Sequence, residues 1–333
     1  MVGIKNVCVL GAGSWGTALA NHLCRRGLNV KIWSPETDVL ADIKSNNKNS
    51  KYFPGVELVT GLKPEGNLQK AVSDAEIIVV SVPSGAYREV AKQLKDFAPK
   101  NTLIVSTGKG LEEGELTCLT DVLMEELGSQ AKIAALSGPS FAFEVLKGLP
   151  TAVVIASKSE VVAKEAAEIF HFDYFRVYTS TDVVGVEVGG AIKNVIALAA
   201  GMADGAGMGN NARAALITRG LAEIQRLVVA MGGSPLTVVG LSGLGDLLLT
   251  SMGDLSRNRR AGIALGQGQK LEEVLKNIGQ VVEGVATAHK AKELAEKYKV
   301  NMPIVSAING VLSNEMTVNT ALSTLLSRAP AGE

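Results

Sequence analysis

The sequence predicts an α/β protein with two parts: a doubly wound parallel sheet over residues 1–185 and an all-helical domain over residues 186–333. Short β-branched runs alternate with helical stretches from residue 6 to about residue 180, which is typical of strand–helix–strand units. A glycine-rich turn directly follows the first run, and strand-like runs mostly stop after residue 182. A length of 333 residues fits two domains of ordinary size.

Several apolar runs are expected to be the strands of the sheet. They are apolar almost without interruption, as in strands that a parallel sheet buries on both faces. The amphipathic stretches 84–97 and 161–170 are expected to be helices between strands. The strand-like runs are "VCVL" (7–10), "NVKIW" (29–33), "EIIVVSV" (76–82), "TLIVST" (102–107), "KIAAL" (132–136), "TAVVIAS" (151–157) and "YFRVYT" (174–179).

The second half consists of helical stretches rich in Ala, Leu and Val, which glycine clusters around 201–209 and 240–245 are expected to interrupt. The most apolar window, about residues 183–202, contains Glu187, Lys193 and Asn194. Membrane spans rarely carry such side chains. We therefore predict that this window is a buried core helix and that the protein does not associate with a membrane.

Charge and cysteine content argue against several kinds of protein. The chain has 33 Lys and Arg against 33 Asp and Glu, so it lacks the basic surplus of a nucleic-acid or anionic-membrane binder. Cys8, Cys24 and Cys118 form no C-x-x-C pair, which argues against a disulfide framework or a zinc knuckle and suits a reduced, cytoplasmic protein. The N-terminus lacks the layout of a signal peptide.

The segment "VCVLGAGSWGTALANHLCRRG" carries Gly11-x-Gly13-x-x-Gly16 between a strand-like run and a helix. In this context Gly11 permits the tight turn, Gly13 lets the backbone approach a pyrophosphate, and Gly16 allows close helix–strand packing. The start of the following helix would face the phosphates with its positive dipole end. The segment predicts a dinucleotide site, and the alternative is a glycine-rich turn without a ligand.

The choice between NAD and NADP stays open. NAD sites usually carry an acidic residue at the end of the second strand, where it holds the ribose hydroxyls. Here Ser34 and Pro35 occupy the expected position and Glu36 comes one step later. No arginine there clearly suits the additional phosphate of NADP.

Polar motifs follow three further strands, where ligands of doubly wound sheets bind. They are "VPS" (82–84), "STGKG" (106–110), which includes Lys109, and "SGPSFAFE" (137–144). Each alone fits ordinary turn chemistry. Together they predict a site at this edge of the sheet, with Lys109 in it rather than on an exposed loop.

The helical half has a second polar cluster, "GLSGLGDLLLTSMGDLSRNRRAG" (240–262). Asp246 either caps the helix that follows it or belongs to a site. The run "RNRR" (257–260) is either a solvated helix face or, beside Ser256, a site for a phosphate monoester, since guanidinium groups bind phosphate bidentately.

An alcohol dehydrogenase needs a group that accepts the hydroxyl proton. No histidine lies at the polar edge of the sheet or near the run "RNRR", and His22, in the helix after the glycine-rich turn, is expected to be structural. No metal-ligand spacing or Ser/His/Asp set occurs. Lys193 lies in an apolar helical run with no partner three or four positions away. It either extends to solvent at the edge of the helix or is the proton acceptor, its pKa lowered by burial and by Lys109 and Arg257 as cationic neighbours.

The chain resembles the soluble NAD(P)-dependent glycerol-3-phosphate dehydrogenases of the bacterial type over essentially its whole length. The resemblance is carried, in order, by "GAGSWGTALA", "VPS", "STGKG", "SGPSFA", "GGAIKNVIALAAG", "GLGDLLLT" and "SRNRRAG". It implies a Rossmann-like N-terminal domain and a C-terminal domain like that of 6-phosphogluconate dehydrogenase. The implied reaction is the reversible reduction of dihydroxyacetone phosphate to sn-glycerol 3-phosphate with NAD or NADP as cofactor, feeding phospholipid synthesis. A cytoplasmic homodimer is implied as well.

By resemblance, Lys193 would be the catalytic proton acceptor, and no metal is implied. The substrate would be bound by Lys109, Gly138, Ser140, Lys193, Asp246, Ser256, Arg257 and Asn258, with its phosphate on Arg257 and Asn258. The cofactor would be bound by Gly11, Gly13, Ser14, Trp15, Gly16, Lys109, Ala142, Arg257, Val281 and Glu283.

One departure from the family pattern concerns the cofactor. Many bacterial relatives carry an arginine or histidine just after the second strand, where this chain has Pro35. NAD therefore stays open beside NADP. Two other functions compete with the implied one: a related reductase of a phosphate-free hydroxy acid, and a dinucleotide sensor without turnover.

Overall fold

The computed structural model describes residues 5–112 and 116–329. The chain forms two compact units, the first ending at Val183 and the second beginning at Val184.

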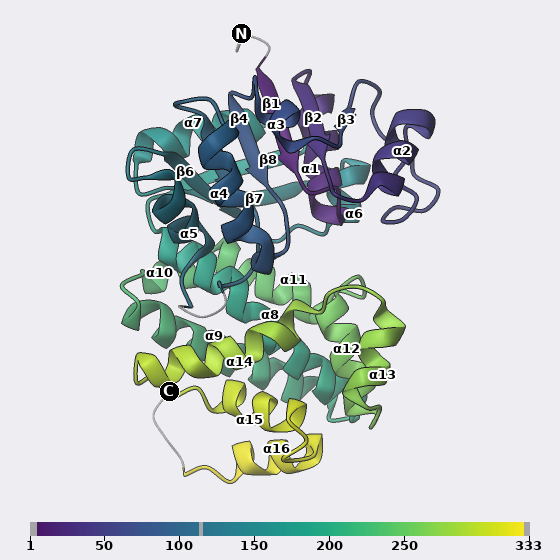
Figure 1. The fold of residues 1–333 in the computed structure, drawn as a ribbon. Coiled ribbons are helices and arrows are strands. Elements are labelled where there is room, and N and C mark those ends of the chain that lie inside the picture. The colour runs from purple at the N-terminus through teal and green to yellow at the C-terminus, as the bar shows by residue number, and fades with distance from the viewer. Residues whose placement is uncertain (1–4, 113–115, 330–333) are drawn as a thin grey trace. The chain divides into compact units, whose positions relative to one another are not determined.

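An eight-stranded sheet forms the centre of the first unit, with the strand order β3-β2-β1-β4-β5-β6-β7-β8 (Figure 1). From β1 the chain adds strands on one side, and from β4 it adds them on the other. The neighbouring strands β1 and β4 therefore flank the switch point at which doubly wound sheets bind ligands. The strands are β1 (Asn6–Leu10), β2 (Asn29–Trp33), β3 (Lys63–Glu65), β4 (Ile77–Val80), β5 (Leu103–Ser106), β6 (Lys132–Ser137), β7 (Thr151–Ala156) and β8 (Phe175–Ser180).

The predicted strands are all present, but the expectation of a wholly parallel sheet is wrong at one pair. Strands β6 and β7 are antiparallel, whereas the other neighbours are parallel. The connection between β6 and β7 contains only the six-residue helix α6 (Ala142–Lys147), and a parallel return needs a longer crossover. Strand β3, with the sequence Lys-Pro-Glu, is an additional edge strand that has no apolar run to predict it.

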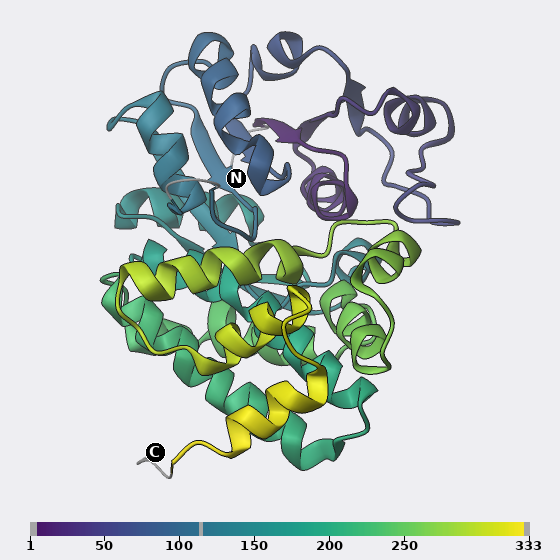
Figure 2. The same cartoon turned by 60° about the horizontal axis from the view of Figure 1, so that its bottom comes forward.

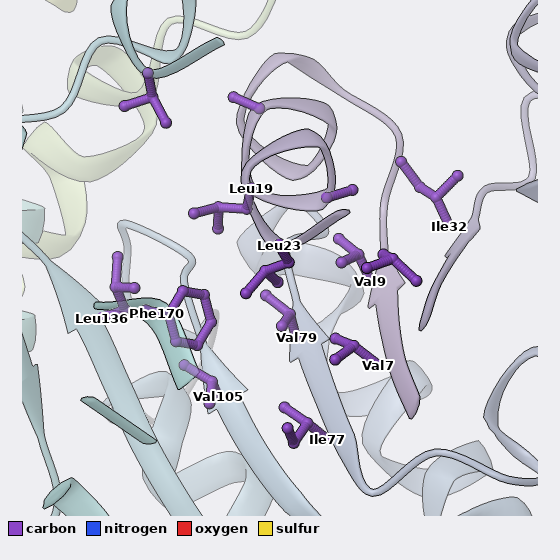
Figure 3. Close-up of a cluster of buried hydrophobic side chains, with 14 of the residues drawn as sticks. Val7, Val9, Leu19, Leu23, Ile32, Ile77, Val79, Val105, Leu136 and Phe170 are labelled. Atoms are coloured by element: carbon purple, nitrogen blue, oxygen red, sulfur yellow. The ribbon is translucent and has the colours of Figure 1, made fainter. Parts of the chain in front are cut away.

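Helices cover both faces of this sheet, because alternate strand residues point to opposite faces. On one face the strands pack against α1 (Ser14–Arg25), α6 and α7 (Glu160–Phe170); on the other they pack against α3 (Leu68–Val72), α4 (Tyr87–Phe97) and α5 (Leu119–Leu127). Helix α2 (Thr37–Asn46) follows β2. The first face buries Val7, Val9, Leu19, Leu23, Ile77, Val79 and Phe170, among others (Figure 3).

His22 of α1 is structural, as predicted. Its side chain is buried, and Nε2 donates to the Phe170 carbonyl at 2.8 Å while Nδ1 lies 3.3 Å from the Tyr174 hydroxyl. Burial lowers the pKa of His22 from 6.5 to about 4, although the hydrogen bond to Phe170 acts in the opposite direction.

We expect the unfolding free energy of the first unit to fall as the pH drops from 6.5 to about 4. In this window the unfolded chain protonates His22 and the folded chain does not, so the unfolded state binds more protons. At about 1.4 kcal/mol per pKa unit, the lowered pKa of His22 reduces the free energy of unfolding by roughly 3 kcal/mol across this pH range. Urea unfolding can be followed by the fluorescence of Trp15 and Trp33, which both lie in this unit. In the variant His22→Gln, the free energy of unfolding should depend much less on pH between 6.5 and 4. An unchanged pH dependence in this variant would show that His22 is not its cause.

The described residues of the second unit form helices and turns (Figures 1 and 2). Helix α8 is buried on nearly all sides, as expected of a core helix. The elements are α8 (Val183–Gly205), α9 (Gly209–Ala230), α10 (Pro235–Val238), the π-helical turn η2 (Leu241–Gly245), α11 (Asp246–Met252), α12 (Arg257–Gly266), α13 (Leu271–Ile278), α14 (Glu283–Lys297), α15 (Pro303–Leu312) and α16 (Val318–Leu326).

Two segments of this unit are long and apolar enough to cross a membrane by length and composition. They are Val183–Gly205, whose most apolar window is 94% buried, and Pro235–Met252, for which the value is 39%. The first matches the predicted core helix. The expected interruptions at the glycine clusters are present, because α8 ends at Gly205 before α9 begins at Gly209, and α10 ends at Val238. The glycines after Gly240 belong to η2, which leads directly into α11.

Candidate active site

The glycine-rich turn has the shape that a dinucleotide needs. Gly11 follows β1 with φ of +107°, and a side chain there would lie 2.5 Å from the Ser81 carbonyl oxygen at the end of β4. A side chain at Gly16 would collide with the Gly11 carbonyl oxygen, so α1 packs directly on the turn. By contrast, a side chain at Gly13 would meet nothing within 4 Å. Two glycines are needed for packing and the middle one faces open space, which fits a pyrophosphate.

The residues around the turn also suit an anion. The first turn of α1, which begins at Ser14, contains no acidic residue. The buried side chain of Asn49 donates to the Ala12 carbonyl at 2.9 Å and to the Thr17 hydroxyl at 2.8 Å, which fixes the turn from behind. The indole nitrogen of Trp15 is buried and has no hydrogen-bond partner in the part of the chain that the structure describes.

We expect Gly13→Ala to weaken dinucleotide binding without destabilising the fold. The added methyl group occupies space that only the ligand would use, because the fold leaves it open. The dissociation constant for NADH, followed through tryptophan fluorescence, should rise by roughly tenfold or more, in keeping with about 1.4 kcal/mol per decade. The melting temperature should stay unchanged. The control Gly16→Ala should lower both stability and binding, and equal behaviour of the two variants would contradict this account.

The end of β2 carries one carboxylate, which is already paired. Glu36 accepts a hydrogen bond from the Tyr52 hydroxyl at 2.9 Å and forms an ion pair with Lys51. Its backbone N–H donates to the buried Ser34 hydroxyl at 3.1 Å. The corner beyond β2 therefore presents both a carboxylate and an ammonium, and the question of NAD or NADP stays as the sequence left it.

Three predicted substrate residues lie together in the first unit. The Lys109 ammonium and the Ser140 hydroxyl both donate to the Gly138 carbonyl oxygen, at 3.3 Å and 3.0 Å. Sequence reasoning missed Tyr87, whose buried hydroxyl accepts the Gly108 N–H at 2.8 Å and so fixes the backbone just before Lys109. Only the fold brings Tyr87 to this position, so no sequence signal could have found it.

Lys193 lies in the core of the second unit and is bound by two side chains of α11. The residue is 3% exposed, so the alternative that it extends to solvent is wrong. Its ammonium donates to Asp246 Oδ1 at 2.8 Å and to Thr250 Oγ1 at 2.6 Å. Asp246 does not cap α11, because Gly245 holds that position. Thr250 was missed, although it lies four residues after Asp246 and so shares its helix face.

Lys193 also forms an ion pair within the second unit, and the expected influence of Lys109 and Arg257 on its pKa stays a prediction. Within the second unit, its ion-pair partner is the anion Asp246, itself 1% exposed. A carboxylate in contact favours the charged ammonium over the neutral amine. The arrangement therefore places a carboxylate oxygen and a hydroxyl oxygen in hydrogen-bond contact with the Lys193 ammonium.

The polar side chains at the start of α12 differ in burial and in their contacts. Ser256 caps the helix by accepting the Arg259 backbone N–H at 3.1 Å. Asn258 is buried and Arg259 is ion-paired, so the run is not a solvated face except at Arg260. Arg257 has no ion pair or hydrogen bond from its side chain to any described residue. Its guanidinium is therefore available for a ligand.

Asn258 belongs to a buried amide chain beside Lys193. Its side chain donates to Asn194 Oδ1 at 2.9 Å and accepts the Gly284 N–H at 2.8 Å. Asn194 in turn donates to Glu283 Oε2 at 2.9 Å. A predicted substrate residue, Asn258, and a predicted cofactor residue, Glu283, are thus joined through the neighbour of Lys193.

The two other predicted cofactor residues occupy helix starts. Ala142 is the first residue of α6 and is partly buried against the core of the first unit. Val281 lies just before α14 and is 59% exposed. Their cofactor contacts stay predictions.

Both parts of the chain match one family of enzymes. Residues 6–163 match the family model for the N-terminus of NAD-dependent glycerol-3-phosphate dehydrogenase, and residues 182–323 match the model for its C-terminus. The chain belongs to the NAD-dependent glycerol-3-phosphate dehydrogenase family. It is therefore an oxidoreductase that uses NAD or NADP, and the Rossmann-like and helical fold class is confirmed.

Individual relatives are similar over nearly the full length. The chain is 49% identical over 324 residues to glycerol-3-phosphate dehydrogenase [NAD(P)+] of Moorella thermoacetica, which covers 97% of this chain and 96% of that one. It is 48% identical over 332 residues to the Bacillus subtilis enzyme of the same name, which covers 99% and 96%. The crystal structure of glycerol-3-phosphate dehydrogenase from Coxiella burnetii superposes with a TM-score of 0.93 at 41% identity, covering 97% of this chain and 99% of that one.

Proposed function

We propose that this protein reversibly reduces dihydroxyacetone phosphate to sn-glycerol 3-phosphate with NADH or NADPH, and that Lys193 handles the proton. The observation that carries the proposal is the buried contact of Lys193 with Asp246 and Thr250. A buried lysine held by a carboxylate and a hydroxyl is costly to maintain for packing alone, and it is suited to acid–base chemistry. The reduced nicotinamide, when bound, supplies the hydride.

In the direction of reduction, the Lys193 ammonium donates a proton to the carbonyl oxygen, which becomes the hydroxyl of glycerol 3-phosphate. In the direction of oxidation, the neutral amine accepts that proton. Asp246 accepts a hydrogen bond from the ammonium in the resting enzyme and holds the flexible side chain in one orientation. The Thr250 hydroxyl accepts a hydrogen bond from Lys193 and donates one to Asp246, so it helps to hold the two side chains in place.

Two cationic groups are assigned to the rest of the substrate and to the cofactor. The family resemblance and the free guanidinium support Arg257 as the phosphate ligand, since an arginine binds phosphate with two parallel hydrogen bonds. Asn258 and Ser256 complete that end of the substrate site. In the first unit, Lys109, Gly138 and Ser140 line the substrate site, with Lys109 also contacting the cofactor.

The same proposal includes the cellular role. Glycerol 3-phosphate made by this enzyme would feed phospholipid synthesis, and the enzyme would work in the cytoplasm as a homodimer. Light scattering on the purified protein tests the dimer directly, because a monomeric mass at working concentration would reject it.

The reaction is tested with the purified protein, dihydroxyacetone phosphate and either NADH or NADPH, followed by the loss of reduced nicotinamide absorbance. Turnover with either cofactor supports the proposal, and the ratio of the two kcat/KM values measures cofactor preference. A folded protein that binds NADH but reduces only phosphate-free keto acids would be the related reductase. One that binds NADH and reduces nothing would be a sensor.

A further inference from the structure

Helix α12 lies against α8 with almost no side chains between their backbones. A side chain at Gly201 or Gly205 of α8 would collide with the carbonyl oxygens of Arg259 and Ile263. A side chain at Gly262 of α12 would in turn collide with the Leu198 carbonyl oxygen. Such contact brings the helix of Lys193 and the helix of Arg257 close together. Because side chains barely interlock here, few contacts fix how α12 is rotated about its axis, and the hydrogen bond from Asn258 to Asn194 is one of them.

An ion pair beside this contact supplies a second constraint. Asp204, in the last turn of α8, accepts hydrogen bonds from Arg259 Nε at 3.1 Å and Nη2 at 2.8 Å. Both side chains are 14% exposed. Asp204 also binds Arg213 of α9, at 3.1 Å and 3.2 Å. A partly buried carboxylate therefore joins three helices at one point, and two donors of Arg259 converge on its single oxygen Oδ2.

The position of Arg259 determines the direction of Arg257. Successive residues of an α-helix are turned by about 100°, so residues two apart point to nearly opposite sides. While Arg259 is held against α8, Arg257 must project on the other side of α12. Pairing with Asp204 also neutralises Arg259, so that it does not compete with Arg257 for an anion at the positive end of the helix.

We propose that Asp204 is a positioning residue for phosphate recognition: by holding Arg259, it fixes the rotation of α12 together with the Asn258–Asn194 hydrogen bond, and thereby the place of Arg257. The inference rests on the proposed function, in which Arg257 binds the substrate phosphate. Asp204 itself touches neither substrate nor cofactor in this proposal.

The test compares dihydroxyacetone phosphate with dihydroxyacetone, which has the same carbonyl and no phosphate. For Asp204→Asn, KM for dihydroxyacetone phosphate should rise by about tenfold or more, as for the loss of a charged hydrogen-bond partner. The kcat/KM for dihydroxyacetone and the dissociation constant for NADH should stay within about twofold, because neither depends on the phosphate ligand. A merely structural role would change both substrates alike.

Asp254 offers a matched control, because it binds the same arginine at 2.8 Å but is 96% exposed. Asp254→Asn should stay within about twofold of the wild type for both substrates, as expected of a surface ion pair. If Asp204→Asn does not fold, Arg259→Lys provides the test. It keeps the charge and loses the two-point contact, so KM for dihydroxyacetone phosphate should again rise selectively.

The outcomes separate the inference from the proposed function. Equal losses for both substrates, or no loss for either, in a folded Asp204→Asn or Arg259→Lys variant would overturn the role of Asp204. If Arg257→Ala loses its preference for the phosphorylated substrate while those variants do not, only the inference fails. If Arg257→Ala itself shows no selective loss, the phosphate assignment is wrong and the inference fails with it.

Discussion

Replacing Lys193 with methionine is expected to lower kcat for dihydroxyacetone phosphate by roughly 10²–10⁴-fold, the range typical of a general acid–base group. Methionine fills a similar volume in the apolar surroundings of α8 but carries no proton. The dissociation constant for NADH should stay near that of the wild type, because the glycine-rich turn lies in the first unit. Steady-state kinetics and fluorescence titration together check both statements.

A second lysine of the same unit provides the control for burial. Lys290 of α14 is 9% exposed, so Lys290→Met also removes a largely buried ammonium. Its effect on kcat should be small even if stability falls. A Lys193→Met enzyme that keeps most of its rate would show that Lys193 is not the proton donor.

Replacing Arg257 with alanine is expected to raise KM for glycerol 3-phosphate and dihydroxyacetone phosphate by an amount equivalent to about 2–4 kcal/mol, the cost of removing a charged partner of a bound group. This corresponds to roughly 30- to 1000-fold in affinity. KM for a phosphate-free analogue should change far less. Arg260→Ala, an exposed arginine of the same helix, is the matched control. Equal effects of Arg257→Ala on both kinds of substrate would reject Arg257 as the phosphate ligand.

Local sequence patterns predicted the elements that depend on local physics. The apolar runs identified β1, β2 and β4 to β8, because a buried strand leaves an apolar run whatever its neighbours are. The turn from Gly11 to Gly16 was recognised because each glycine has its own steric reason. In the structure a side chain at Gly11 or Gly16 would collide with backbone atoms, whereas Gly13 faces open space. The burial of Lys193 was one of two alternatives that its apolar helix left open, and the structure decides for it.

Contacts between segments that are far apart in the chain could not be predicted from the sequence. Asp246 was named as a candidate, yet its contact with Lys193 depends on how α11 packs on α8, 53 positions along the chain. The cationic influence of Lys109 and Arg257 on Lys193 stays a prediction, and the anion Asp246 is a neighbour that the sequence did not place there. The reversal of β7 and the contact of Tyr87 with Gly108 likewise depend on chain paths that no local pattern records.

The pH dependence of dihydroxyacetone phosphate reduction in the wild type and in Asp246→Asn tests most directly whether Lys193 donates the proton under the influence of Asp246. The amide keeps an acceptor near Lys193 but removes the negative charge that favours the ammonium. The account predicts that kcat of the variant begins to fall at a lower pH than kcat of the wild type, because the ammonium is lost more readily. A variant whose kcat falls at the same pH as that of the wild type would contradict it.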